Sequence, residues 1–171
     1  MMKTKLQPRT SRNRKKSAVP LSKLRTSEVV RTVVDHPRRL EELVTLLQDK
    51  DRAVRGRAAA TLARLSESHP SRLVRHLERL SASLEDDSAY VRWHLAYTLG
   101  RVSAGFPGRA SSVLADLSSR LKDEDKVVRR FACRALESVA TRKPELIKDL
   151  FTDRKAEMPQ SLARMLVDST P

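Results

Sequence analysis

The stretches DKDRAVR (residues 49–55), DDSAYVR (residues 86–92) and DEDKVVR (residues 123–129) are three copies of one pattern. In each copy an Asp is followed six positions later by an Arg, with a Val directly before the Arg, and the copies lie 37 residues apart. Residues outside the pattern recur with the same period: Leu62, Leu99 and Leu136, and also Pro70, Pro107 and Pro144. A fixed period of this length indicates stacked structural units, each packed on its neighbours, in place of a single globular core.

Each copy contains two amphipathic segments. In the first copy, apolar residues three or four positions apart mark two helix faces, at Val54, Ala58, Leu62 and Leu65 and then at Leu73, Leu77, Leu80 and Leu84. The repeated prolines stand where the second helix would begin, a position that tolerates proline because the missing N–H would have no partner there. Residues that favour helix N-caps precede the first helices: Asp51, Ser88 and Asp125.

These patterns predict an all-α protein, an α-solenoid of about four antiparallel helix pairs over residues 27–171. The expected units span residues 27–47, 48–84, 85–121 and 122–158, and a capping helix is expected at residues 159–168. Short, atypical units are what a stack needs to cover its exposed apolar ends.

The basic charge of the chain is concentrated near its N-terminus. The net charge is +14, and residues 1–27 contain nine Lys or Arg residues and no Asp or Glu, which leaves +5 for residues 28–171. A segment this polar cannot bury enough apolar surface to fold alone, so residues 1–26 are expected to form a disordered basic arm. Such an arm either solubilises the protein or contacts phosphates or an acidic surface, with its densest charges at Arg12, Arg14, Lys15 and Lys16.

The repeat pattern resembles that of the HEAT-repeat family, whose units are antiparallel helix pairs with a Pro near the turn, an Asp between units and a Val-Arg early in the first helix. The resemblance extends over roughly residues 28–155. It implies that the recurrent acids and arginines bond from one repeat to the next and form a structural ladder of Asp49, Arg55, Asp86, Arg92, Asp123 and Arg129. It also implies that the protein works as an adaptor or scaffold.

The expected first helices, at residues 52–66, 89–104 and 126–140, carry ten Lys or Arg residues against a single acid, Glu137. On the middle one, Trp93, Tyr97 and Arg101 form a stripe with a spacing of four, on a different side from the apolar face. This stripe either binds a partner through stacking and cation–π contacts or fills the groove between neighbouring first helices. The predicted partner-binding residues on these helices are Arg57, Arg64, Trp93, Tyr97, Arg101, Arg130 and Arg134.

No pattern in the sequence points to an enzyme, a cofactor or a small-molecule substrate. The four His residues lack the spacing of metal ligands, Gly-rich phosphate loops are absent, and one Cys gives no disulfide framework. No apolar run resembles a signal peptide or a membrane span, so a cytoplasmic protein is expected. We therefore predict a non-enzymatic module that binds a protein partner with an acidic surface. Nucleic-acid binding through the basic arm and the basic helix face is the alternative, and base excision of the DNA-glycosylase type is a minor one.

Overall fold

The computed structural model describes residues 19–168, and within this range the chain forms helices and loops with no β-strand. One set of helices, called the first helices, comprises α1 (Thr26–Asp35), α3 (Arg52–Ser68), α5 (Ala89–Gly105), α7 (Lys126–Ala140) and α9 (Gln160–Asp168). The second helices are α2 (Leu40–Thr45), α4 (Leu77–Ala82), α6 (Ser111–Ser119) and α8 (Pro144–Leu150). The all-α fold predicted from the sequence is therefore confirmed.

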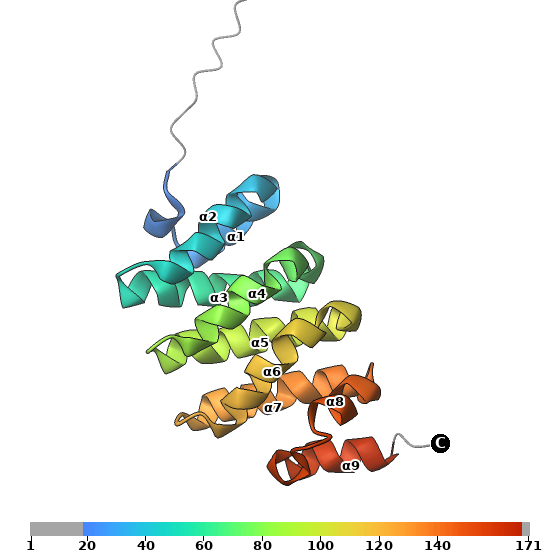
Figure 1. The fold of residues 1–171 in the computed structure, drawn as a ribbon. Coiled ribbons are helices and arrows are strands. Elements are labelled where there is room, and N and C mark those ends of the chain that lie inside the picture. Colours follow the sequence, from blue (N-terminus) through green and yellow to red (C-terminus); the bar gives the residue numbers. More distant parts are fainter. Residues whose placement is uncertain (1–18, 169–171) are drawn as a thin grey trace, which may run out of the picture.

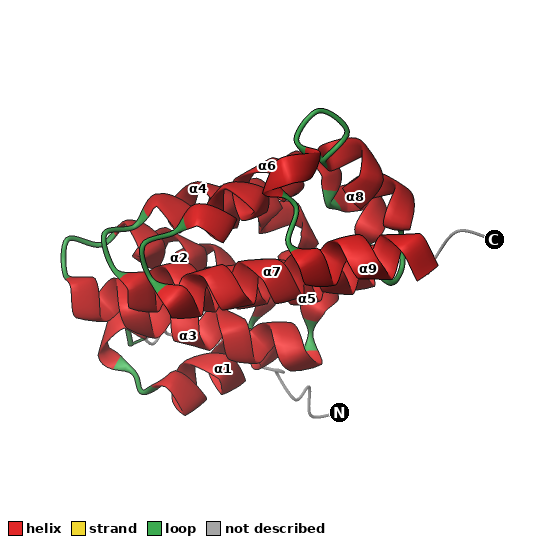
Figure 2. Ribbon diagram, turned by 90° about the horizontal axis from the view of Figure 1, so that it is seen from below, coloured by secondary structure: helices red, strands yellow, loops and turns green. Residues whose placement is uncertain are grey.

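The helices stack in two layers (Figures 1 and 2). In one layer each first helix packs against the next, in the order α1, α3, α5, α7 and α9, and the contact between α5 and α7 is the most extensive. In the other layer α4 packs on α6, and α6 packs on α8. Figure 2 shows the second helices along one side of the stack and the first helices along the other. This is the solenoid architecture that the 37-residue period predicts.

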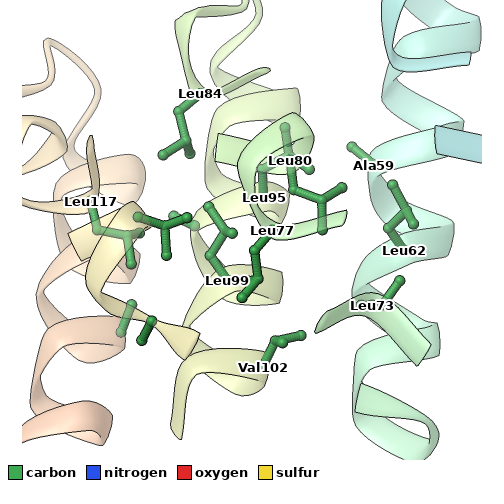
Figure 3. Packing of buried hydrophobic residues seen from close by; sticks show 14 of the residues in the cluster. Ala59, Leu62, Leu73, Leu77, Leu80, Leu84, Leu95, Leu99, Val102 and Leu117 are labelled. Atoms are coloured by element: carbon green, nitrogen blue, oxygen red, sulfur yellow. The ribbon is translucent and has the colours of Figure 1, made fainter. Parts of the chain in front are cut away.

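The core lies between the two layers and is filled mainly by leucine (Figure 3). The repeated Leu62, Leu99 and Leu136 are fully buried, each on a different first helix. They meet leucines of the second helices, as Figure 3 shows for Leu99 of α5 beside Leu77 of α4. Burying one such side chain stabilises the fold by about 1.5–3 kcal/mol, so the recurrent leucines hold the two layers together.

Two of the three predicted capping residues begin first helices with a side-chain hydrogen bond. Asp51 and Asp125 accept hydrogen bonds from backbone N–H groups in the first turns of α3 and α7. Ser88 occupies the same position before α5, but its hydroxyl makes no capping hydrogen bond. The backbone N–H of Ser88 instead donates to Oδ1 of Asp86 over 2.8 Å. The loop before α5 is therefore held by Asp86 and not by the predicted serine cap.

The second helices are shorter and less regular than the first. Short 3₁₀ segments, at Pro37–Arg39, Pro70–His76 and Pro107–Arg109, precede α2, α4 and α6. Only α8 begins directly at its proline, Pro144. In all four places proline opens the helical segment, where it costs no hydrogen bond.

The packed part of the chain begins before residue 27, the boundary predicted from the sequence. Leu21 is only 2% exposed, and its N–H donates to Oε1 of Glu42 over 2.9 Å. Arg39 donates to the carbonyl of Val19, and α1 begins at Thr26. Residues 19–26 thus belong to the packed part of the chain, because a buried leucine anchors them to the first unit. Residues 1–18, which include the predicted basic residues Arg12, Arg14, Lys15 and Lys16, lie outside the described range.

Candidate functional site

Two ion pairs connect successive first helices with the loops of the next unit. Nε of Arg55 lies 2.6 Å from Oδ2 of Asp86. Arg92 binds Asp123 through two nitrogens on one edge of its guanidinium, with Nε 2.9 Å from Oδ2 and Nη2 2.8 Å from Oδ1. Each pair joins residues 31 positions apart, so each forms a rung between one repeat and the next.

The other two residues of the implied ladder, Arg129 and Asp49, form no ion pair with a neighbouring repeat in the described part of the chain. Nη1 of Arg129 donates to the backbone carbonyls of Asp123 and Glu124, in its own unit. The residue 37 positions after Asp123 is Gln160, which carries no charge. Oδ1 of Asp49 accepts from the N–H of Asp51. Neither Arg129 nor Asp49 forms an ion pair with any residue in 19–168, so the structure places four of the six implied residues in rungs.

Both rung carboxylates remain ionised to low pH. Burial favours the neutral acid and would raise the pKa of Asp123, but the hydrogen bonds from Arg92 and the N–H of Asp125 outweigh it, so the pKa is lowered. The same balance of burial against the hydrogen bond from Arg55 lowers the pKa of Asp86. These charges therefore serve the contacts between units and are not free for a partner.

Four of the six aromatic residues of the chain form one cluster on α5 and α7. The Trp93 ring stacks on Phe131 with centroids 5.1 Å apart, and it meets Tyr90 edge to face at 5.6 Å. Tyr97 approaches Phe131 edge to face at 5.8 Å. Tyr90 is 50% exposed, and the other three rings are half-buried, so this aromatic cluster is partly accessible to solvent.

Sequence reasoning did not include Phe131 or Glu67 in the site. Phe131 is one residue after Arg130, the position equivalent to Trp93, and it fills the groove between α5 and α7. The alignment of Phe131 with Trp93 could have been predicted from the sequence, since an aromatic side chain on a helix leans over the preceding turn. Glu67 accepts a hydrogen bond from the Tyr97 hydroxyl over 3.1 Å. Burial and this hydrogen bond raise the pKa of Tyr97.

Two open hollows flank the ridge formed by Tyr97 and Phe131. The α3–α5 hollow has a volume of about 400 Å³ and is lined chiefly by Ala60, Ala63, Arg64, Glu67, Trp93 and Tyr97. The α5–α7 hollow has a volume of about 240 Å³ and is lined chiefly by Tyr97, Gly100, Arg101, Phe131, Arg134 and Ser138. Small residues from neighbouring helices sit beside aromatic ones in both, which leaves space at the surface.

The predicted arginines divide among these surfaces. Arg64 lines the α3–α5 hollow, whereas Arg101 and Arg134 line the α5–α7 hollow. Arg130 is exposed on α7 and lines neither hollow. Nη2 of Arg57 donates to the carbonyl of Ser22 over 2.9 Å, so this side chain binds the N-terminal segment and is not part of the cluster.

A buried histidine borders the aromatic cluster. His94 is 7% exposed, and its ring stacks on Trp93 with centroids 3.5 Å apart. Nδ1 lies 2.7 Å from the carbonyl of Tyr90, so this nitrogen carries the proton and donates. Burial lowers the pKa of His94, and the hydrogen bond to Tyr90 opposes only part of this effect. Burial likewise lowers the pKa of His76 in the second layer.

These histidines should make stability depend on pH. With a lowered pKa in the folded chain, the unfolded state binds more protons, so the free energy of unfolding falls as pH drops from about 6.5 through the folded pKa. We expect His94→Gln to weaken this dependence in urea unfolding followed from about pH 7.5 to 5, and His76 contributes in the same direction. His36→Gln, at an exposed position, is the control and should keep the wild-type slope. An unchanged slope in His94→Gln would contradict the assignment.

Within residues 19–168 no three His, Cys, Asp or Glu side chains are grouped so that they could hold a metal ion. None of the helices in this range is long and apolar enough to cross a membrane. The side chains that cluster on α5 and α7 are aromatic rings and arginines.

Comparisons with known proteins agree with this architecture. The family model for HEAT repeats matches residues 77–167, more than half of the chain. A computationally designed armadillo-repeat protein for modular peptide recognition is similar with a TM-score of 0.64 and 19% identity, over 86% of this chain and 68% of its own. A designed armadillo-repeat protein in complex with the peptide (KR)4 gives a TM-score of 0.59 and 16% identity, over 86% and 68%. Comparison with curated protein sequences finds no match. The structural likenesses show the fold alone, and the matched repeats show that this chain belongs to the HEAT-repeat family.

Proposed function

We propose that this protein is a non-enzymatic binding module whose partner is a protein with an acidic surface. The observation that carries the proposal is the aromatic cluster, with three half-buried rings and one exposed ring, beside Arg101 and Arg134 and with the exposed Arg130 directly before Phe131 in the sequence. Aromatic and arginine side chains are enriched among the residues that dominate binding energy at protein interfaces. The HEAT-repeat architecture, which presents an extended surface, supports the same function.

The charge of this face supports an acidic partner. The guanidinium groups of Arg101, Arg130 and Arg134 form no hydrogen bond or ion pair with other residues in 19–168, unlike those of the rungs. Unpaired surface arginines raise the local positive potential, and this steers the approach of an acidic partner. One structural neighbour was solved with the basic peptide (KR)4, whereas the face described here has the charge to bind a peptide of opposite sign.

The stacking within the cluster favours a protein over a nucleic acid. The rings of His94 and Phe131 lie nearly parallel to that of Trp93, with interplanar angles of 25° and 22°. These contacts already use ring surface that a stacked base would need, and base stacking is a main source of affinity for single strands. Nucleic-acid binding is therefore the result that would contradict the proposal.

The test compares two charge-reversed proteins of equal net charge. Arg130→Glu/Arg134→Glu alters the proposed face, and Arg38→Glu/Arg142→Glu alters exposed arginines elsewhere. Each is immobilised, and the proteins retained from nuclease-treated extract of the source cells are identified by mass spectrometry. We expect a discrete acidic protein to bind the wild type and the second variant and to be lost from the first.

A separate titration of the purified protein with single- and double-stranded DNA and RNA tests the alternative, nucleic-acid binding. Tight binding whose affinity falls steeply with salt, together with no acidic protein that distinguishes the variants, would overturn the proposal in favour of nucleic-acid binding.

A further inference from the structure

We infer that the α5–α7 hollow binds the carboxylate of an acidic side chain in the partner, held between Arg101 and Arg134 in a clamp. The inference rests on the proposed function and names which part of the ligand the hollow takes. Both arginines line this hollow, one from each of two neighbouring helices. A carboxylate entering between them can accept charge-assisted hydrogen bonds from both, and arginine is the side chain best suited to binding carboxylates.

The floor of the hollow is formed by small residues because α5 and α7 approach closely. A Cβ atom built on Gly100 would lie 2.7 Å from Cβ and 2.8 Å from Cα of Ala135. Ser138 continues this floor along α7. The space above it, about 240 Å³, is bounded by the rings of Tyr97 and Phe131, so the hollow has the size of a single side chain.

Both guanidinium groups are available for a ligand. Arg101 and Arg134 are exposed, and neither donates a side-chain hydrogen bond or forms an ion pair within residues 19–168. Glu67 of α3 accepts a hydrogen bond from the Tyr97 hydroxyl on the other side of the ridge, and Glu137 of α7 accepts one from the hydroxyl of Ser161. No Asp or Glu lines the α5–α7 hollow, so its positive charge is not compensated by the residues around it.

The α3–α5 hollow differs in chemistry and complements the clamp. It carries one arginine, Arg64, together with Glu67, and its other main lining residues are apolar or aromatic. It therefore suits an apolar side chain. Neighbouring packed helices lie about 8–10 Å apart, and an extended chain advances about 3.3 Å per residue. The two hollows accordingly fit a peptide with an apolar residue and an acidic residue about three positions apart.

The probe is a neutral-ended octapeptide, acetyl-Ser-Gly-Leu-Ser-Gly-Glu-Gly-Ser-amide, with a version in reversed order and a version with Gln in place of Glu. Each is titrated into ¹⁵N-labelled full-length protein, and backbone amide shifts are followed by NMR. We expect the Glu peptide, in at least one order, to shift residues of α5 and α7 around the hollow. The Gln peptide should bind about tenfold more weakly, because it loses the charge-assisted hydrogen bonds.

Variants on the same helices locate the effect. Arg101→Gln and Arg134→Gln should each weaken the Glu peptide by about tenfold and leave the Gln peptide unchanged. Arg130→Gln is the matched control, since it removes the same charge from α7 one turn earlier without touching the hollow. A version of the peptide with phosphoserine in place of Glu tests whether any anion is sufficient for binding. If this peptide binds as tightly as the Glu peptide, the assignment of the hollow to a carboxylate is overturned.

Failure of the clamp and failure of the proposed function give different results. Equal binding of the Glu and Gln peptides, or an equal loss in Arg130→Gln and Arg134→Gln, overturns the clamp while shifts at Trp93 and Tyr97 still support a peptide-binding face. If no peptide shifts any residue of the aromatic cluster, the clamp is wrong and the proposed function loses its site.

Discussion

Arg92→Ala is expected to lower the free energy of unfolding by about 3 kcal/mol, because it leaves a buried carboxylate without the guanidinium that donates hydrogen bonds to both of its oxygens. Arg92 is 5% exposed and Asp123 is 8% exposed. The other cation beside Asp123 is Arg120, whose Nη1 lies 3.6 Å from Oδ2, farther than the two hydrogen bonds of the rung. At about 2–4 °C per kcal/mol for a chain of this size, the melting temperature should fall by roughly 6–12 °C. Thermal and urea unfolding followed by circular dichroism would measure the change.

The chain contains its own control for this variant. Arg92 donates to the carbonyls of Asp86 and Asp87, and Arg129 makes the same two contacts one repeat later but has no rung. Arg129→Ala should therefore cost less than about 1 kcal/mol, and the difference between the variants measures the contacts of Arg92 with Asp123 and Glu124 together with the burial of its side chain. Equal losses in the two variants would show that the rung adds nothing to stability.

The pH dependence of the same variant provides a second readout. A lowered pKa means that Asp123 stabilises the wild type above about pH 3.9, and this contribution is lost as pH falls through the folded value. In Arg92→Ala burial still favours the neutral acid, and only the N–H of Asp125 and the charge of Arg120 remain to oppose it. The variant should therefore be relatively less destabilised in acid than at neutral pH.

Gly100→Ala is expected to lower the free energy of unfolding by about 2 kcal/mol, against the usual preference of a helix for alanine. The new Cβ would lie 2.7 Å from Cβ and 2.8 Å from Cα of Ala135, so α5 and α7 must move apart. Overpacking of this kind costs about 1–3 kcal/mol, which outweighs the gain of up to about 1 kcal/mol from helix propensity. Urea unfolding at neutral pH would measure the net effect.

Gly105→Ala, on the same helix, separates packing from propensity. A Cβ at Gly105 meets no atom within 4 Å, so this substitution should be neutral or stabilise by up to about 1 kcal/mol. Adding Ala135→Gly to Gly100→Ala should restore only part of the loss, since Cα of Ala135 remains in the way. A stabilised Gly100→Ala protein would show that the helices separate without cost.

The repeat period was enough to predict the fold, because every copy places leucine at core positions and proline at the start of the second helix. Local rules also placed the capping residues Asp51 and Asp125. The packing of residues 19–25 could not be predicted from the repeat period or from these local rules. Leu21 and Leu24 are a single apolar pair in a polar segment, too short a pattern to predict a packed element, and only the surface of the first unit makes their packing favourable.

The site was less predictable, because it depends on how neighbouring helices are aligned. Comparison of equivalent positions paired Trp93 with Arg130, whereas the structure places Phe131 against the tryptophan ring. Arg57 and Arg64 both lie on α3, but only the Arg57 side chain binds the N-terminal segment, by donating to the carbonyl of Ser22. The period itself could have shown where the ladder stops, since Gln160 stands where the next Asp would be.

The position of the two rungs has a consequence for how the chain opens. They join α3, α5 and α7 to one another through the intervening loops, and no rung in the described part of the chain reaches α1 or α9. In a stack whose stability is a sum of neighbour terms, α1 and α9 can detach while the middle remains closed. The aromatic cluster lies on α5 and α7, within the segment that opens last. Amide hydrogens there should exchange only when the whole stack unfolds, so a partner would meet a surface that is already in place.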